Sequence, residues 1–272
     1  MPLSALSLAL AAAFLHAFWN LLLARARDPE CATAIALLAA VIAFAPVTAL
    51  TWQLDNRVWP FLAVTSVLQL VYFALLGTAY RIAELSFVYP VARGLAPVVV
   101  LLAGVTIGQA TSAAQIAGVC LVAAGVLLVR GLHRPSRSSG LLFALGIAAC
   151  IASYTLIDKH GIRYAAPITY LELSMLPAAA VYAGTVLAVR GRERMRMEVG
   201  LPAIAAGLAS FGAYALVLAA LERASAASVA AVRETSVVIA TALAARVLHE
   251  RVGRMRLAGA GLVACGIALL AY

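Results

Sequence analysis

The most polar stretch inside the chain reads Gly131-Leu-His-Arg-Pro-Ser-Arg-Ser-Ser139, and it lies at the midpoint of the 272 residues. Long apolar runs fill the sequence on both sides of this stretch, five before it and five after it. Equal numbers of runs on either side indicate an internal duplication. We therefore predict two units, residues 1–130 and 140–272, joined by a linker over 131–139.

Each apolar run is long enough to cross a membrane, because one crossing takes about 20 mostly apolar residues. The ten runs cover 3–24, 31–51, 58–79, 84–107, 113–130, 140–157, 166–188, 201–221, 225–248 and 255–272. Only 11% of the residues are charged and 65% are hydrophobic, whereas a soluble domain has about a quarter charged residues. The sequence predicts an all-α polytopic membrane protein in contact with a lipid bilayer, with no room for a soluble catalytic domain.

The two units share residues at a nearly constant offset. Pairs separated by 140 to 142 positions are Arg93 and Arg233, Tyr72 and Tyr214, Arg81 and Arg223, Gly118 and Gly259, and Gly125 and Gly266. Because each unit has an odd number of crossings, the second unit must enter the membrane from the opposite face. The predicted fold class is therefore ten transmembrane helices arranged as two inverted five-helix repeats.

The basic residues predict the orientation. Of the 20 Lys and Arg residues, 13 lie in the loops that follow odd-numbered runs and four in the loops that follow even-numbered runs. Since cytoplasmic loops carry the excess of Lys and Arg, both termini are expected outside the cell membrane, and the cluster from Arg190 to Arg196 inside. This distribution accounts for the net charge of +9 without nucleic acid as a partner. A secretory signal is disfavoured for the first run, which lacks a basic N-terminal region.

One cation lies deep in a predicted helix. Arg93 is nine residues into the run 84–107, and at 1.5 Å per residue its Cα is about 14 Å deep in a core of about 30 Å. Pro90 and Pro97 flank it and remove backbone donors. Arg233 occupies the matching place in the second unit, next to Glu234. Charged groups at this depth line a polar cavity or pair with neighbouring helices, and the sequence leaves both possibilities open.

Other polar side chains share the predicted helices. His16 and Asn20 are four residues apart, with Trp19 between them, so they project from one helix face. The expected substrate-binding residues are His16, Trp19, Asn20, Tyr72, Tyr89, Arg93, Tyr154, Tyr214 and Arg233. Two carboxylates, Glu234 and the shallower Glu172, are the expected proton-coupling residues; a permanent ion pair at Glu234 is the alternative.

Signals for catalysis and metal binding are poor. The four cysteines are far apart, with no Cys/His cluster at metal-ligand spacing. His249 and Glu250 begin like a zinc-protease motif, but the second His is missing. The sequence also lacks a P-loop, a nucleophile elbow and a dinucleotide fingerprint. We therefore expect neither an enzyme nor a cofactor or metal.

Several motifs together resemble the EamA family of the drug/metabolite transporter superfamily. They are Leu15-His-Ala-Phe-Trp-Asn20, Tyr89-Pro-Val-Ala-Arg-Gly-Leu-Ala-Pro97, Tyr154-Thr-Leu-Ile-Asp-Lys159, and Leu248-His-Glu-Arg-Val252 before the Gly-rich last run. The resemblance covers the whole chain. It implies a carrier of small organic metabolites in which helices one to four and six to nine surround a central cavity, while helices five and ten pack at the periphery.

The leading hypothesis is a secondary transporter of a small polar metabolite in the cytoplasmic membrane, working by alternating access and acting in export. An amino-acid-like compound or an organic anion is favoured, because arginines hold carboxylates. A multidrug/proton antiporter is the alternative within transport, and a membrane-embedded enzyme or an assembly subunit is the alternative outside it. The chain is expected to act as a monomer or a homodimer.

Overall fold

The computed structural model of the chain describes residues 1–82, 85–106, 108, 110–130, 139–239, 242 and 253–271. In this part of the chain helices predominate, and the sole β interaction is an isolated bridge between Leu54 and Ala165. The helices are α1 (Leu3–Ala24), α2 (Pro29–Leu50), η1 (Asn56–Val58), α3 (Trp59–Ile82), α4 (Leu85–Thr106), α5 (Ala113–Arg130), α6 (Ser139–Gly161), α7 (Pro167–Arg190), α8 (Arg192–Met197), α9 (Leu201–Leu221), α10 (Ala226–Arg233) and α12 (Arg254–Ala271). The predicted linker, apart from Ser139, lies outside the described residues.

Most helix ends agree with the apolar runs to within a few residues. α6 continues to Gly161, four residues beyond the predicted end, and the short α8 between the apolar runs was not predicted. α4 runs through Pro97 without interruption. The apolar runs match the helices because a long apolar stretch in lipid can satisfy its backbone hydrogen bonds only as a helix.

The predicted helix 225–248 is interrupted early. α10 ends at Arg233, Glu234 forms a turn, and helix resumes over residues 235–239. The amide of Glu234 donates to the carbonyl of Ala231 at 3.1 Å, and the Thr235 hydroxyl donates to the carbonyl of Val232 at 2.6 Å. These bonds replace the i to i−4 pattern of an α-helix, so the chain turns at the buried carboxylate.

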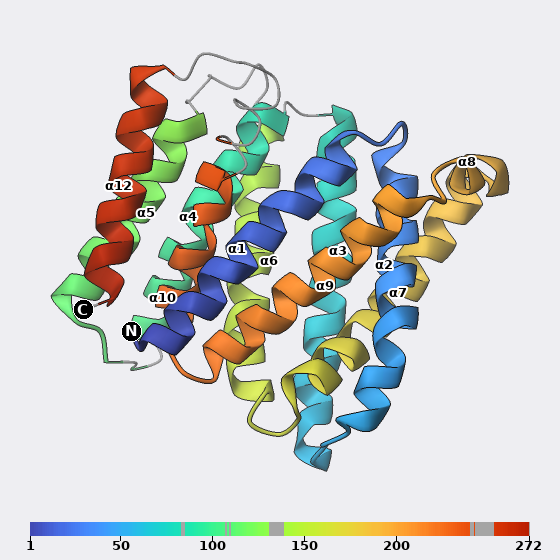
Figure 1. Cartoon of the computed structure of the whole chain (residues 1–272), viewed down its shortest axis with the longest axis horizontal. Helices are drawn as coiled ribbons and strands as arrows, with labels where there is room; N and C mark the ends of the chain where they lie inside the picture. The colour runs from blue at the N-terminus through green and yellow to red at the C-terminus, as the bar shows by residue number, and fades with distance from the viewer. Residues whose placement is uncertain are drawn as a thin grey trace.

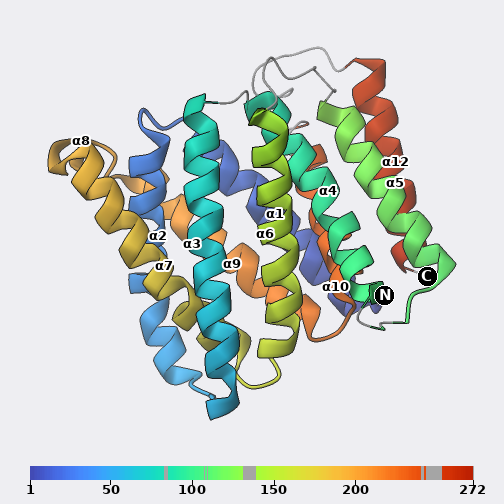
Figure 2. The same ribbon diagram turned by 180° about the vertical axis from the view of Figure 1, so that it is seen from behind.

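The helices pack in pairs, and each pair joins one helix from the first half of the chain to one helix from the second half. α1 packs along α9, and α3 packs along α6; Figure 1 shows the first pair crossing the front, and Figure 2 shows the second pair on the opposite face. α2 packs against α7 at one end of the molecule, and α5 packs against α12 at the other (Figure 1). Contacts between α4 and α6 are likewise matched by contacts between α10 and α1.

The interface of α5 and α12 depends on four glycines. A Cβ at Gly118 would come within 2.9 Å of the carbonyl of Gly266, and a Cβ at Gly125 within 2.6 Å of the carbonyl of Gly259. Only glycine allows backbones to approach this closely. Because the earlier glycine of α5 meets the later glycine of α12, the two helices are antiparallel.

Loops meet at both ends of the bundle. At one end, Arg190 pairs with Glu30 at 2.8 Å, and the amide of Asp28 donates to Glu198 at 3.0 Å. At the other end, the segment after α2 meets the turn after α6. There the amides of Asp55 and Ala166 donate to the carbonyls of Tyr164 and Gln53, at 2.7 and 3.1 Å.

The segment after α2 also contains an exposed ion pair. The Arg57 guanidinium, hydrogen-bonded to the carboxylate of Asp55, lowers the pKa of that carboxyl to about 2. This contact, together with the short η1 helix, fixes the chain as it enters α3.

The outer surface of the bundle is apolar. Leu50, Leu3, Ile42 and Leu142 are each more than 70% exposed. Within the described residues, six helices are long and apolar enough to cross a membrane, and shorter apolar segments lie at Val91–Thr106, Ala113–Val129 and Leu257–Leu270. A water-soluble protein does not expose so many large apolar side chains. The chain is a multi-pass membrane protein in contact with lipid.

Candidate functional site

A cavity of about 100 Å³ lies between the two halves of the chain. Cavities of this order, about 150 Å³, hold a molecule the size of benzene. Its described lining residues come from α1, α2, α3, α4, α6, α7 and α9. The wall is mainly apolar and aromatic. Its side chains with polar atoms include His16, Trp19, Gln69, Tyr72, Arg93, Tyr154 and Tyr214.

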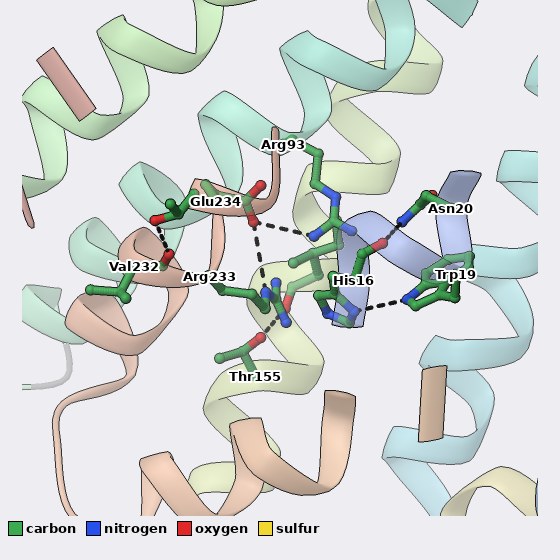
Figure 3. Close-up of polar contacts among 10 residues, drawn as sticks. His16, Trp19, Asn20, Arg93, Thr155, Val232, Arg233 and Glu234 are labelled. Carbon is green, nitrogen blue, oxygen red and sulfur yellow. Dashed lines mark hydrogen bonds and ion pairs between the residues drawn. The ribbon is translucent and has the colours of Figure 1, made fainter. Parts of the chain in front are cut away.

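The α1 wall is held by bonds within the helix. The indole of Trp19 donates to Nδ1 of His16 at 2.9 Å, and the amide of Asn20 donates to the carbonyl of His16 at 2.6 Å (Figure 3). Nδ1 therefore acts as an acceptor, so a neutral His16 ring carries its proton on Nε2. Asn20 supports this wall from behind and does not line the cavity.

Three tyrosines form an aromatic row along the cavity. The ring of Tyr154 lies edge-on between Tyr72, at a centroid distance of 6.3 Å, and Tyr214, at 5.7 Å. Tyr72 and Tyr214 come from α3 and α9, and Tyr154 comes from α6. The row therefore joins both halves of the chain. Rings with hydroxyl tips suit a substrate that has both apolar and polar parts.

A buried charge cluster adjoins this row. Arg93 Nη1 lies 3.2 Å from Glu234 Oε1, and Arg233 Nε lies 3.7 Å from the same oxygen. Figure 3 shows both guanidinium groups beside the carboxylate of Glu234. Arg93 lines the cavity, whereas Arg233 and Glu234 lie behind it and are 1% and 0% exposed. Arg233 Nη2 and Glu234 Oε2 have no hydrogen-bond partner among the described residues.

A second buried carboxylate lies at the end of α6. Asp158 accepts hydrogen bonds from Thr65 at 2.6 Å, from Tyr170 at 2.9 Å and from the hydroxyl of Tyr214. The donors come from α3, α7 and α9, so one carboxylate joins four helices. Asp158 is 0% exposed, and Tyr214 is its connection to the cavity.

Most of the expected substrate-binding residues converge. His16, Trp19, Tyr72, Arg93, Tyr154 and Tyr214 line one cavity. Arg233 lies in the charge cluster behind the wall, and the side chain of Tyr89 lies outside the described part. Glu172 is buried on α7, with Oε2 lacking a hydrogen-bond partner among the described residues, and it does not line the cavity. The roles of these residues in transport remain predictions.

Sequence reasoning missed Asp158, Thr65, Tyr170 and Gln69. Asp158 was placed just beyond the predicted end of its helix, and the true end at Gly161 puts it inside. The signal was present, because Tyr154 and Asp158 repeat the four-residue spacing of His16 and Asn20. The hydroxyls that donate to Asp158 come from three other helices, so the sequence alone did not indicate that they meet there.

The described residues contain no group of three His, Cys, Asp or Glu side chains placed to hold a metal ion. Cys31 and Cys150 are buried, and none of the four cysteines is in a disulfide. His249 and Glu250 lie outside the described part of the chain.

Known proteins share the fold and the sequence pattern of this chain. The chain has the fold of a solved protein described only as "Crystal structure of protein", with a TM-score of 0.78, 16% identity and coverage of 99% of this chain and 96% of that one. No curated protein matches the sequence significantly. The family model of the EamA-like transporter family matches twice, over residues 3–131 and 138–272. These two matches span almost the whole sequence, so the chain belongs to the EamA-like transporter family, within the drug/metabolite transporter superfamily.

Proposed function

We propose that this protein is a secondary transporter that exports a small organic anion or an amino-acid-like metabolite across the cytoplasmic membrane. The observation that carries the proposal is the cavity wall at Arg93, with Arg233 behind it and Glu234 between them. Two guanidinium groups share one carboxylate there. A bound carboxylate would add charge compensation to this cluster and could hydrogen-bond a guanidinium.

The polar atoms of the wall support a substrate class. Gln69 lines the cavity, and its buried Oε1 has no hydrogen-bond partner among the described residues. An N–H donor on the substrate would satisfy this oxygen, while Arg93 would hold a carboxylate. The tyrosine row offers contact to an apolar side chain. These three features together suit a monocarboxylate with an apolar part, and an N–H donor on it would add a hydrogen bond to Gln69.

The antiporter alternative has less support. A hydrophobic cation needs a carboxylate or a bare aromatic surface, and Arg93 on the wall would repel it. Glu172 and Glu234 are not among the described lining residues.

Alternating access is supported by the pairing of each helix of the first half with a helix of the second half. Antiparallel packing of α5 against α12, the last helices of the two halves, supports a two-fold axis perpendicular to these helices, which would be an axis in the membrane plane. We therefore propose two inverted five-helix repeats, 1–130 and 140–272, with ten crossings, both termini outside and a linker at 131–139.

Metabolite profiling tests the proposal. Cells with and without the protein are compared, in the cell and in the medium, and lipophilic dye cations are tested in parallel. A carboxylate or amino-acid pool that moves from cell to medium with the protein is the expected result. Export of dye cations with unchanged carboxylate pools would support the antiporter instead.

A further inference from the structure

The carboxylate of Asp158 has surroundings that differ from those of Glu234. Glu234 faces two guanidinium groups, which are its counter-charges. Asp158 is bonded to three hydroxyls, and no cation of the described residues forms an ion pair with it. A fully buried carboxylate held only by neutral donors can take up a proton without breaking an ion pair.

Lys159, which follows Asp158 in the chain, forms its hydrogen bonds with other groups. Lys159 donates to the carbonyls of Leu221 and Ala224, at the end of α9. Arg233 interacts with Asp158 electrostatically, but it pairs with Glu234. The titratable groups that interact with Asp158 are Tyr154 on α6 itself, Tyr170 on α7, Tyr214 on α9 and Arg233, the partner of Glu234, on α10. Two helices packed against α6 also carry the cavity residues Tyr72, on α3, and Arg93, on α4.

We propose that Asp158 is the proton site of the transporter and that Tyr214 couples it to the substrate cavity. This inference rests on the proposed transport of an anion and supplies its coupling ion. The charges support it, since Arg93 and Arg233 balance Glu234 and an ionised Asp158. Protonation of Asp158 leaves one uncompensated positive charge, which matches a substrate with one negative charge.

The hydroxyl of Tyr214 provides the connection. While Asp158 is ionised, this hydroxyl donates to Oδ2 and cannot donate into the cavity. A proton from hydronium in the cavity passes to Tyr214 as Tyr214 gives its own proton to Oδ2, so water and a neutral carboxyl result. The new carboxyl then donates to the Tyr214 oxygen, and the Tyr214 hydroxyl is free to donate to a substrate carboxylate. Proton and anion therefore bind together and cross the membrane together, so the proposed export is driven by the outward gradient of the substrate, with a proton leaving alongside it.

Isotope-edited infrared spectroscopy tests the proton site in the unmodified protein. The chain has only three aspartates, Asp28, Asp55 and Asp158, and the first two lie in loops. Carboxyl-labelled aspartate is incorporated, and the purified protein in lipid is titrated. The expected result is a protonated-carboxyl band that grows as the pH falls and shifts with labelled aspartate. A band that shifts only with labelled glutamate, or no such band, would overturn the proposal.

Variants extend the test. Asp158→Asn should abolish this band, whereas Glu172→Gln, the matched control on α7, should retain it. Tyr214→Phe keeps the ring and removes the hydroxyl, so the band should remain and its midpoint should move. Should Asp158→Asn fail to fold, the labelled unmodified protein and Tyr214→Phe still decide the outcome.

Binding of benzoate, a monocarboxylate of suitable size, tests the coupling. Above the midpoint its affinity should fall about tenfold per pH unit, and this dependence should be absent in Tyr214→Phe. An unchanged slope in Tyr214→Phe would overturn the coupling. If benzoate shows no binding at any pH, anion transport through this cavity is contradicted, while the infrared band still decides whether Asp158 takes up a proton.

Discussion

Glu234 is the residue on which the buried charges depend. Its carboxylate is the counter-charge for both Arg93 and Arg233, and all three side chains are almost completely buried. Removing one partner from a buried ion pair leaves an uncompensated charge, which is far more costly than losing an exposed pair. The turn that ends α10 at Glu234 places the carboxylate between the two arginines.

Glu234→Gln should therefore lower the free energy of unfolding by about 3–5 kcal/mol, because two guanidinium groups lose their counter-charge. Unfolding of the purified protein in detergent, followed by circular dichroism, measures the loss. Glu222→Gln is the control: Glu222 pairs with Arg223 at the exposed end of α9, and its loss should cost at most about 1 kcal/mol. Equal effects of the two substitutions would show that the buried cluster contributes no more than an exposed ion pair.

Glycines set the distances between helices at the element scale. Gly207 of α9 faces α2, and a Cβ there would come within 2.1 Å of the carbonyl of Ala36. A Cβ at Gly184 of α7, by contrast, would meet no atom of the described residues within 4 Å. A backbone carbonyl cannot turn aside as a flexible side chain can, so the two glycines differ in what they tolerate.

Gly207→Ala should separate α2 from α9 and destabilise the protein by at least about 2 kcal/mol, near the upper part of the range for overpacking. Gly184→Ala should have no destabilising effect, since alanine favours helix over glycine. Thermal unfolding in the same detergent compares the two variants. A Gly207→Ala protein as stable as the Gly184→Ala protein would contradict the close approach of α2 and α9.

Physical reasons explain which parts of the structure the sequence predicts. Apolar runs predict the helices, because a backbone in lipid must bond within itself. The turn at Glu234 could not be predicted, since apolar residues continue through it. Depth along a helix predicted that Arg93 and Arg233 are buried. Depth does not determine which side of a helix faces the cavity. The structure places Arg93 on the cavity wall and Arg233 behind it.

The whole molecule is expected to have one orientation in the membrane. Loops that follow odd-numbered runs carry 13 of the 20 basic residues, and the structure brings two of these loops together where Arg190 meets Glu30. We expect both termini outside and the loop containing α8 in the cytoplasm. A reporter active only in the cytoplasm should be silent when fused after Tyr272 and active when inserted within α8. The opposite pattern would reverse the orientation.

The central claim is that anion transport takes place through the cavity at Arg93. The most direct measurement is metabolite profiling of cells that produce either the unmodified protein or Arg93→Gln at equal membrane levels, with Arg57→Gln as the exposed control. The unmodified protein and Arg57→Gln should move the same carboxylate or amino-acid pool into the medium, and Arg93→Gln should reduce that movement at least tenfold, the loss of about 1.4 kcal/mol or more expected for a charge-assisted hydrogen bond. The same profile from all three proteins would contradict transport through this cavity.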